Sequence, residues 1–176
     1  MGRLFYFAYG SNLHPMRLRA RTPSASVLGR ARLRGYCLGF HKRGRDQSAK
    51  CNARRTGQGG DMVHGVVYRI ARGERRMLDR AEDLGQGYDR VRLRVSVGGR
   101  QRVVFAYLAR HEAIRDGLRP FDWYLEYVQR GARHHGLTGR YLQRLQREVS
   151  VRDWSSARRR FNRRVLLSGA PPYRRQ

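Results

Sequence analysis

The chain has 176 residues, enough for one domain with a sizeable core, and its 39 Lys and Arg residues against 13 Asp and Glu residues give a formal net charge of +26. No stretch is long and apolar enough to predict a membrane span, and no basic segment followed by an apolar one indicates a signal peptide. Cys37 and Cys51 lack metal-ligand spacing, so we expect reduced thiols in a cytoplasmic protein without a metal site.

The basic residues are almost all arginine. Only Lys42 and Lys50 are lysines. A charge of this size predicts nonspecific attraction to polyanions such as nucleic acid, but it does not identify nucleic acid as the biological partner.

The first strand and the turn after it lie between Leu4 and Leu13. The stretch is apolar and aromatic up to Gly10, which is typical of a buried central strand. Gly10 allows a sharp turn, and Ser11 or Asn12 can cap the helix predicted to begin near His14. A turn before a helix N-terminus directs unpaired N–H groups into one space, which attracts anions. The alternative is an ordinary strand-turn-helix corner.

Strand patterns dominate the rest of the first two thirds. The segment 27–36 alternates apolar or small residues with Arg, and 37–41 is predicted to continue the same strand with a bend at its glycines. The pattern predicts further strands within 44–53, over 64–70, and in a hairpin joined by Gly98-Gly99 between 88–97 and 101–109. At least five strands with a short helix inserted at 73–83 indicate an α+β fold.

Two polar residues stand out from these elements. Glu82 lies beside the apolar side of the helix 73–83, where a carboxylate requires a partner or a proton. It is therefore either in an ion pair with one of the many arginines or in an environment suited to proton transfer. Lys50 is either a compact ammonium required at its position or an ordinary loop cation.

The last third is predicted to be helical. Apolar residues from Phe121 to Ala132 have helical spacing, Gly136 ends the run, and a second helix from Thr138 carries apolar residues up to Val149. Residues 151–176 contain eight arginines and one acid. We therefore divide the chain into a domain over residues 1–150 and a basic C-terminal arm over 151–176, which packs partly on the domain.

Five motifs in order resemble those of the γ-glutamylcyclotransferases. They are Phe7-Ala8-Tyr9-Gly10-Ser11-Asn12-Leu13, Ser48-Ala49-Lys50-Cys51-Asn52-Ala53, His64-Gly65-Val66-Val67-Tyr68, Leu78-Asp79-Arg80-Ala81-Glu82 ahead of Tyr88, and the helical segment Tyr124 to Leu145. The resemblance covers residues 4 to 146. It implies a small mixed β-barrel of five or more strands with flanking helices.

The resemblance also implies a reaction and its residues. The free α-amine of a γ-glutamyl group attacks its own γ-carbonyl, which yields 5-oxoproline and a released amine or amino acid without a cofactor. Glu82 matches the family's general acid/base, and the turn that matches Tyr9 to Leu13 holds the substrate with backbone amides. Tyr124 matches a tyrosine that reaches the pocket, although plain core packing is an equal alternative.

Lys50, Asn52 and Tyr88 are expected near the pocket. The released amine is left open among glutathione, γ-glutamyl amino acids, γ-glutamylamines and a γ-glutamyl-protected intermediate. The rival interpretation of the whole chain is a nucleic-acid-binding basic protein on the same fold, with weak or no enzyme activity.

Overall fold

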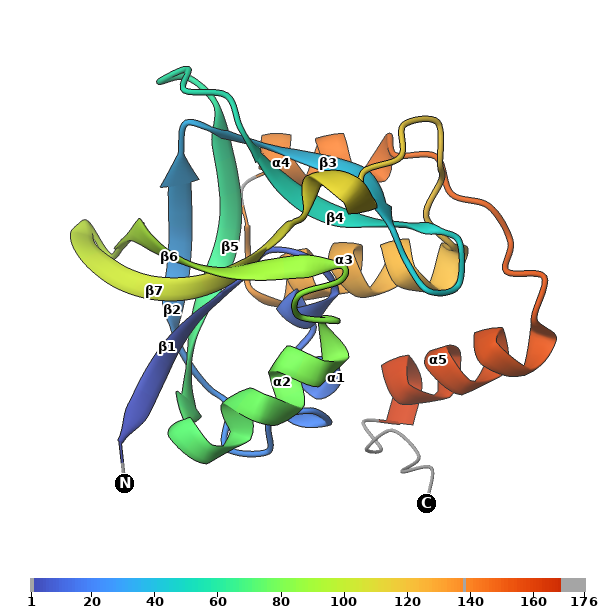
Figure 1. Ribbon diagram of the computed structural model, residues 1–176, viewed down its shortest axis with the longest axis horizontal. Helices are drawn as coiled ribbons and strands as arrows, with labels where there is room; N and C mark the ends of the chain where they lie inside the picture. Colours follow the sequence, from blue (N-terminus) through green and yellow to red (C-terminus); the bar gives the residue numbers. More distant parts are fainter. Residues whose placement is uncertain (1, 138, 169–176) are drawn as a thin grey trace.

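The computed structural model describes residues 2–137 and 139–168 and contains a closed five-stranded barrel flanked by helices (Figure 1). This confirms the α+β barrel predicted from the sequence. The strands are β1 (Arg3–Ala8), β2 (Ser26–Arg34), β3 (Tyr36–Arg43), β4 (Ala49–Arg55), β5 (Met62–Ala71), β6 (Tyr88–Val97) and β7 (Arg100–Ala109). The α-helices are α1 (Pro15–Arg19), α2 (Arg75–Ala81), α3 (Asp122–His134), α4 (Gly139–Gln146) and α5 (Ser156–Ser168), and the 3-10 helices are η1 (Ser11–Leu13), η2 (Arg72–Glu74) and η3 (His111–Ala113).

The barrel is mixed because β1 lies between two strands of opposite sense. It pairs antiparallel with β5 and parallel with β7, where Tyr6 is opposite Phe105. The order β1-β5-β2-β6-β7 closes the sheet. The β6–β7 hairpin has the predicted turn, since Gly98 and Gly99 both have positive φ, 56° and 80°, as a two-residue turn between twisted strands requires. Strand β1 is thus the buried central strand that its apolar run predicted.

The predicted strand over 27–41 is wrong in one respect, because it breaks in two. Gly35 has φ 74°, a conformation that favours glycine, and it ends β2. The chain then leaves the barrel, and β3 and β4 form a separate two-stranded sheet. The glycine-rich bend was therefore predicted at the right place, but it redirects the chain to another sheet. This second sheet brings β4 toward the end of β1, which matters for the site.

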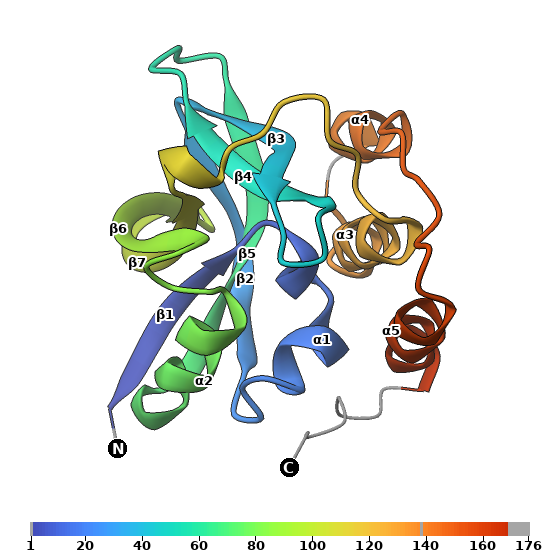
Figure 2. The ribbon, with the colours of Figure 1, turned by 45° about the vertical axis from the view of Figure 1, so that its right-hand side comes forward.

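Helix α3 lies beside the barrel with α4 and α5 packed on it, and α2 lies away from them (Figures 1 and 2). Helix α3 confirms the predicted run, and it buries Trp123, Tyr127 and Val128 against the core. The predicted second helix ends at Gln146, so Val149 lies outside α4 and is exposed, and the cap expected at Thr138 falls outside the described residues. None of the helices in the part of the chain that the structure describes is long and apolar enough to cross a membrane.

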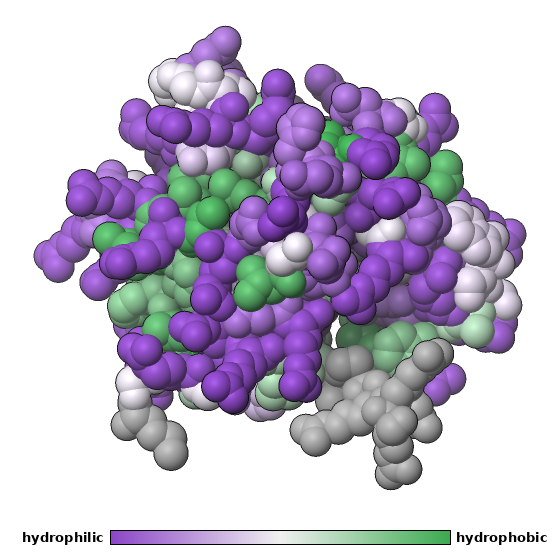
Figure 3. Space-filling view, viewed as in Figure 1, coloured by the Kyte–Doolittle hydropathy of each residue, from purple (hydrophilic) through white to green (hydrophobic). Residues whose placement is uncertain are grey.

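The predicted basic arm contains α5, which packs on the domain. Val165 and Leu166 are buried in the common hydrophobic core, and the Tyr127 hydroxyl donates to the backbone carbonyl of Asn162. Acids of the domain face the helix: Asp122 accepts from Arg159. Figure 3 shows that hydrophilic residues cover most of the face seen in Figure 1.

The buried histidine at the start of α1 makes the fold acid-sensitive. The His14 ring packs edge-on against Tyr127, its Nδ1 is buried without a partner among the described residues, and burial lowers the His14 pKa to about 4. The unfolded chain therefore binds more protons between pH 6.5 and 4, so stability that is present above pH 6.5 is lost as pH falls. We expect the free energy of unfolding to fall by roughly 3 kcal/mol over this range from His14 alone.

Urea denaturation at pH 7, 6, 5 and 4 measures this effect. The variant His14→Phe should flatten the pH dependence, whereas His111→Gln, at an exposed position, should leave it unchanged. An equally steep loss of stability in His14→Phe would contradict the assignment.

Candidate active site

The turn after β1 is a short 3-10 helix with a closely packed glycine before it. The amides of Leu13 and His14 donate to the carbonyls of Gly10 and Ser11, which leaves the amides of the first turn without an acceptor inside the helix. Gly10 has φ −106°, so the turn does not require glycine for its backbone angle. A Cβ there would instead lie 3.0 Å from the Cβ of Cys51 and 3.4 Å from the Tyr124 hydroxyl. Gly10 therefore lets β4 and α3 approach the turn.

Leu13 fixes the turn from behind. Its carbonyl accepts a hydrogen bond from the Tyr68 hydroxyl at 3.1 Å and lies 3.0 Å from His135 Nε2. A Cβ on Gly131 of α3 would lie only 2.6 Å from the Leu13 backbone. Helix α3 can therefore pack this closely against the turn because residue 131 is a glycine. The side chain of Leu13 is fully buried. Leu13 thus anchors the turn and does not line the cavity beside it.

Glu82 follows α2 as its C-terminal cap and points toward the turn. Its Oε1 accepts hydrogen bonds from Asn12 Nδ2 at 2.8 Å and from Arg21 at 2.6 Å. Arg21 also donates to Asn12 Oδ1, and Asn12 Nδ2 lies 2.9 Å from the Tyr6 hydroxyl. Of the two predicted alternatives for Glu82, the ion pair is therefore present, and its partner is Arg21. Oε2 has no partner among the described residues, so one carboxylate oxygen is held and the other is available.

A pocket lies between this carboxylate and the turn, and we call it the tyrosine pocket. Its cavity volume is about 20 Å³, and it is open to solvent. Its lining consists of five tyrosines, the turn, one cysteine and one acid: Tyr6, Tyr9, Gly10, Ser11, Asn12, Cys51, Glu82, Tyr88, Tyr107 and Tyr124. Glu82 is the one charged residue in this lining.

The tyrosines and the cysteine that line the tyrosine pocket are neutral at physiological pH. Burial raises the pKa of all five tyrosines above the ordinary value, so they remain hydroxyl donors. Burial also raises the pKa of the Cys51 thiol to about 12, which leaves no thiolate to act as a nucleophile. The Cys51 backbone is fixed by two of the tyrosines, since its amide donates to the Tyr124 hydroxyl and its carbonyl accepts from Tyr88.

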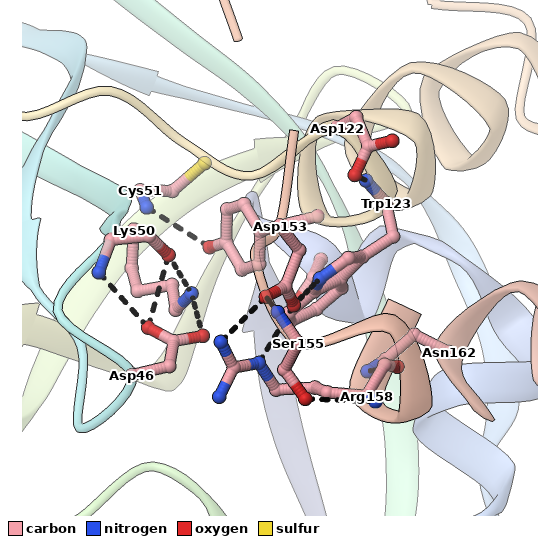
Figure 4. A network of polar contacts seen from close by, with 12 residues as sticks. Asp46, Lys50, Cys51, Asp122, Trp123, Asp153, Ser155, Arg158 and Asn162 are labelled. Carbon is pink, nitrogen blue, oxygen red and sulfur yellow. Dashed lines mark hydrogen bonds and ion pairs between the residues drawn. The ribbon is translucent and has the colours of Figure 1, made fainter. Parts of the chain in front are cut away.

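A second, wider cavity of about 220 Å³ adjoins the first, and we call it the basic hollow. The two share Ser11, Glu82, Tyr88 and Tyr124. Five cations line the basic hollow: Arg17, Arg21, Lys42, Arg45 and Lys50. Figure 4 shows Lys50 turned onto Asp46, which it contacts at 2.8 Å. The Lys50 ammonium also lies 4.6 Å from the Tyr124 ring and 5.0 Å from the Trp123 ring, and burial lowers its pKa to about 8.

Most predicted site residues meet at these two cavities. The tyrosine pocket contains Tyr9, Gly10, Ser11, Asn12, Glu82, Tyr88 and Tyr124, and the basic hollow contains Lys50. Asn52 does not join them. Neighbouring residues of a strand face opposite sides of the sheet, so while Cys51 faces the tyrosine pocket, Asn52 lines a different cavity and accepts from the Ala109 amide.

Several residues of the site were missed by the sequence analysis. Tyr6 and Tyr107 complete the tyrosine pocket, and Arg21 holds Glu82. Arg17 lines the basic hollow, where it donates to the Ser11 hydroxyl at 3.0 Å and to Asn162 Oδ1 at 3.2 Å. Helix α5 therefore reaches the wall of this cavity. Nothing in the local pattern distinguished these two arginines from the others in the chain.

The arrangement suits proton transfer to and from a bound substrate. Across residues 2–137 and 139–168, no group of three His, Cys, Asp or Glu side chains is placed to hold a metal ion. A carboxylate with one oxygen fixed and one available can accept and return a proton. The hydroxyls of Tyr9, Tyr88 and Tyr107 already donate inside the protein. The hydroxyls of Tyr6 and Tyr124, which accept from Asn12 and Cys51, and the turn amides can donate to carbonyl and carboxylate oxygens.

The chain is similar to known proteins over most of its length. Residues 6–125 match the sequence model of the family described as gamma-glutamyl cyclotransferase, AIG2-like. The chain is 30% identical to gamma-glutamylcyclotransferase from Homo sapiens over 148 residues, which cover 80% of this chain and 76% of that protein. It is 31% identical to gamma-glutamylcyclotransferase from Mus musculus over 149 residues with the same coverage. A solved structure named gamma-glutamyl cyclotransferase superposes with a TM-score of 0.78 at 25% identity, covering 88% of this chain and 92% of that chain.

Proposed function

Because the chain belongs to the gamma-glutamyl cyclotransferase, AIG2-like family, we propose that it converts a small γ-glutamyl compound into 5-oxoproline and a free amine or amino acid. The observation that carries this proposal is the state of Glu82: Oε1 is fixed by Asn12 and Arg21, whereas Oε2 has no partner among the described residues. A carboxylate held in this way beside a small pocket can move a proton without moving itself.

The proposed reaction needs two proton transfers. After the bound ammonium has lost one proton to solvent, the neutral α-amine attacks the γ-carbonyl carbon and forms the new C–N bond of the five-membered ring, and the attacking nitrogen gives its second proton to Glu82. The old amide C–N bond then breaks, and Glu82 returns the proton to the departing nitrogen. Ring closure is intramolecular, so holding the chain in a bent conformation supplies much of the rate.

The electrostatics of the tyrosine pocket fit this assignment. Glu82 is the one charged lining residue, so it attracts the protonated α-amine and favours its placement at Oε2. The amides of the turn at Gly10 to Asn12 are suited to the α-carboxylate or to the developing oxyanion. Tyr124 lies on the same wall, where its hydroxyl accepts the Cys51 amide and faces the pocket. We assign Tyr9, Gly10, Ser11, Asn12, Tyr88 and Tyr124 to substrate binding.

The rival interpretation, a nucleic-acid-binding protein on the same fold, has no support in the comparisons. The relatives reported above are gamma-glutamylcyclotransferases. The charge of +26 remains a reason for nonspecific attraction to polyanions, which is a property of the surface and separate from the chemistry of the pocket.

We predict that Glu82→Gln lowers kcat/KM for 5-oxoproline release on the order of a hundredfold or more, because the amide keeps an oxygen for Asn12 and Arg21 but cannot carry the proton. Chromatographic detection of 5-oxoproline over a panel of γ-glutamyl substrates measures the effect. Circular dichroism and thermal melting should match the wild type. The control Glu112→Gln changes a carboxylate whose side chain is 72% exposed and should keep full activity. Wild-type turnover by a folded Glu82→Gln protein would rule out the proposed role.

Two buried asparagines offer a matched comparison. Asn12→Ala and Asn52→Ala each remove buried hydrogen bonds, so each should lower the free energy of unfolding by about 2 kcal/mol. Only Asn12→Ala removes a hydrogen bond to the carboxylate of Glu82. Displacement of a catalytic group lowers kcat/KM by about tenfold or more. Urea denaturation and the 5-oxoproline assay together separate the two effects. An equal loss of activity in both variants would place Asn52 in the site as well.

A further inference from the structure

Helix α5 lies beyond residues 6–125, which match the family model, and it packs against α1 and α3. Val165 and Leu166 enter the common hydrophobic core, as described above. The helix also buries a polar residue, Asn162, which is only 7% exposed. Because buried polar side chains need hydrogen-bond partners, the contacts of Asn162 show what this helix is held against.

Three hydrogen bonds fix Asn162, and its side-chain oxygen contacts α1. Its Nδ2 donates to the Arg158 carbonyl at 2.9 Å, one turn earlier in α5. Its backbone carbonyl accepts from the Tyr127 hydroxyl of α3 at 2.8 Å. Its Oδ1 accepts from Arg17 of α1 at 3.2 Å. The side chain is therefore held at both of its polar atoms, and its oxygen is directed at Arg17.

Arg17 continues this contact to the turn after β1. Its Nε donates to the Ser11 hydroxyl at 3.0 Å, and its guanidinium lies 4.4 Å from the centroid of the Tyr127 ring. Two neutral oxygens and an aromatic face therefore orient this cation. Ser11 lines both the tyrosine pocket and the basic hollow. The contacts that begin at Asn162 thus end at the wall that the two cavities share.

The same C-terminal segment also holds Trp123, which lines the basic hollow (Figure 4). The Trp123 indole donates to Asp153 Oδ2 at 2.7 Å. Arg158 of α5 donates to both oxygens of that carboxylate, at 2.7 and 2.6 Å. Trp123 lies beside Arg17, whose guanidinium is 5.7 Å from its ring. Residues after 150 therefore support two neighbouring side chains in the wall of the cavity.

We propose that α5 is part of the active site and that Asn162 is a positioning residue, which holds the turn at Ser11 through Arg17. The inference rests on the proposed function, in which this turn binds the substrate. Asn162 lines neither cavity, so it acts through Arg17 and not by touching the substrate. The boundary at residue 150 then divides the chain by sequence pattern but not by function, because turnover depends on a residue of the predicted arm.

Two variants of Asn162 test the positioning role. Asn162→Ala removes the acceptor of Arg17 and should lower kcat/KM for 5-oxoproline release by about tenfold, because small displacements of a substrate-binding group slow the reaction. Asn162→Asp keeps an oxygen for Arg17 and should keep kcat/KM near the wild-type value. Both variants lose the bond to the Arg158 carbonyl, so the difference between them reports the contact with Arg17.

A double-mutant cycle shows whether the effect passes through Arg17. Arg17→Met keeps an aliphatic side chain over the Tyr127 ring but loses the bonds to Ser11 and Asn162, so it should lower kcat/KM at least as much as Asn162→Ala. The double variant should lose no more than Arg17→Met alone, because the second change removes a contact that is already gone. Losses that multiply in the double variant would overturn the inference.

A control on the same helix separates positioning from weaker docking of α5. Arg159→Met removes the ion pair of α5 with Asp122, and it should keep full activity. Thermal melting of each variant shows whether the fold is retained. Should Asn162→Ala fail to fold, Asn162→Leu, which has nearly the same shape as asparagine, takes its place in every comparison.

Hydrogen exchange of the turn gives a reading that does not depend on turnover. The amides of Leu13 and His14 are bonded within the turn, so a loosened turn exchanges them faster. Mass spectrometry of a peptide covering residues 9–18 should show faster exchange in Asn162→Ala than in wild type, Asn162→Asp or Arg159→Met. If no γ-glutamyl compound yields 5-oxoproline, the proposed function fails, and this comparison alone decides the positioning role. Exchange or turnover at the wild-type level in a folded Asn162→Ala protein, or an equal change in Arg159→Met, overturns it.

Discussion

The hydrogen bonds that converge on Glu82 Oε1 set the geometry of the whole site. Asn12 and Arg21 lie 70 and 61 residues before Glu82 in the chain, and both donate to the same oxygen. Because Arg21 also donates to Asn12, and Asn12 contacts Tyr6, the four side chains form one connected network. The network ties the turn after β1 to the end of α2. These contacts hold one oxygen of the carboxylate and leave the other on the side of the pocket.

The two adjoining cavities differ in the charge of the residues that line them. The tyrosine pocket holds neutral donors and a single carboxylate, so hydrogen bonds and one charge orient whatever reacts there. The cations stand in the basic hollow, beyond Glu82. If Arg17 or Lys42 lined the tyrosine pocket, it would repel the protonated α-amine and weaken the attraction of Glu82. The two cavities meet at the shared wall of Ser11, Glu82, Tyr88 and Tyr124, so Glu82 stands between a neutral pocket and a cationic one.

Sequence patterns predicted what depends on local order. Alternation located the barrel strands, the Gly98-Gly99 pair located a hairpin, and helical spacing located α3. Patterns could not show that the chain changes sheets at Gly35, because the alternation continues on both sides of it. They could not select Arg21 or Arg17 from so many arginines, since the choice depends on which carboxylate and which hydroxyl lie opposite in space. The position of Asn52 depends in the same way on which side of β4 faces the pocket.

The many arginines of the C-terminal segment have a structural role as well as an effect on surface charge. In the C-terminal segment several arginines form ion pairs: Arg158 pairs with Asp153 of the same segment, and Arg159 pairs with Asp122 of the domain. Their abundance there reflects packing of α5 as well as surface charge, so the number of arginines alone does not indicate a polyanion partner. The chain has only two lysines, and they are distributed differently from the arginines. Lys42 and Lys50 both line the basic hollow, where Lys50 pairs with Asp46 and Lys42 lies over the face of the Tyr88 ring.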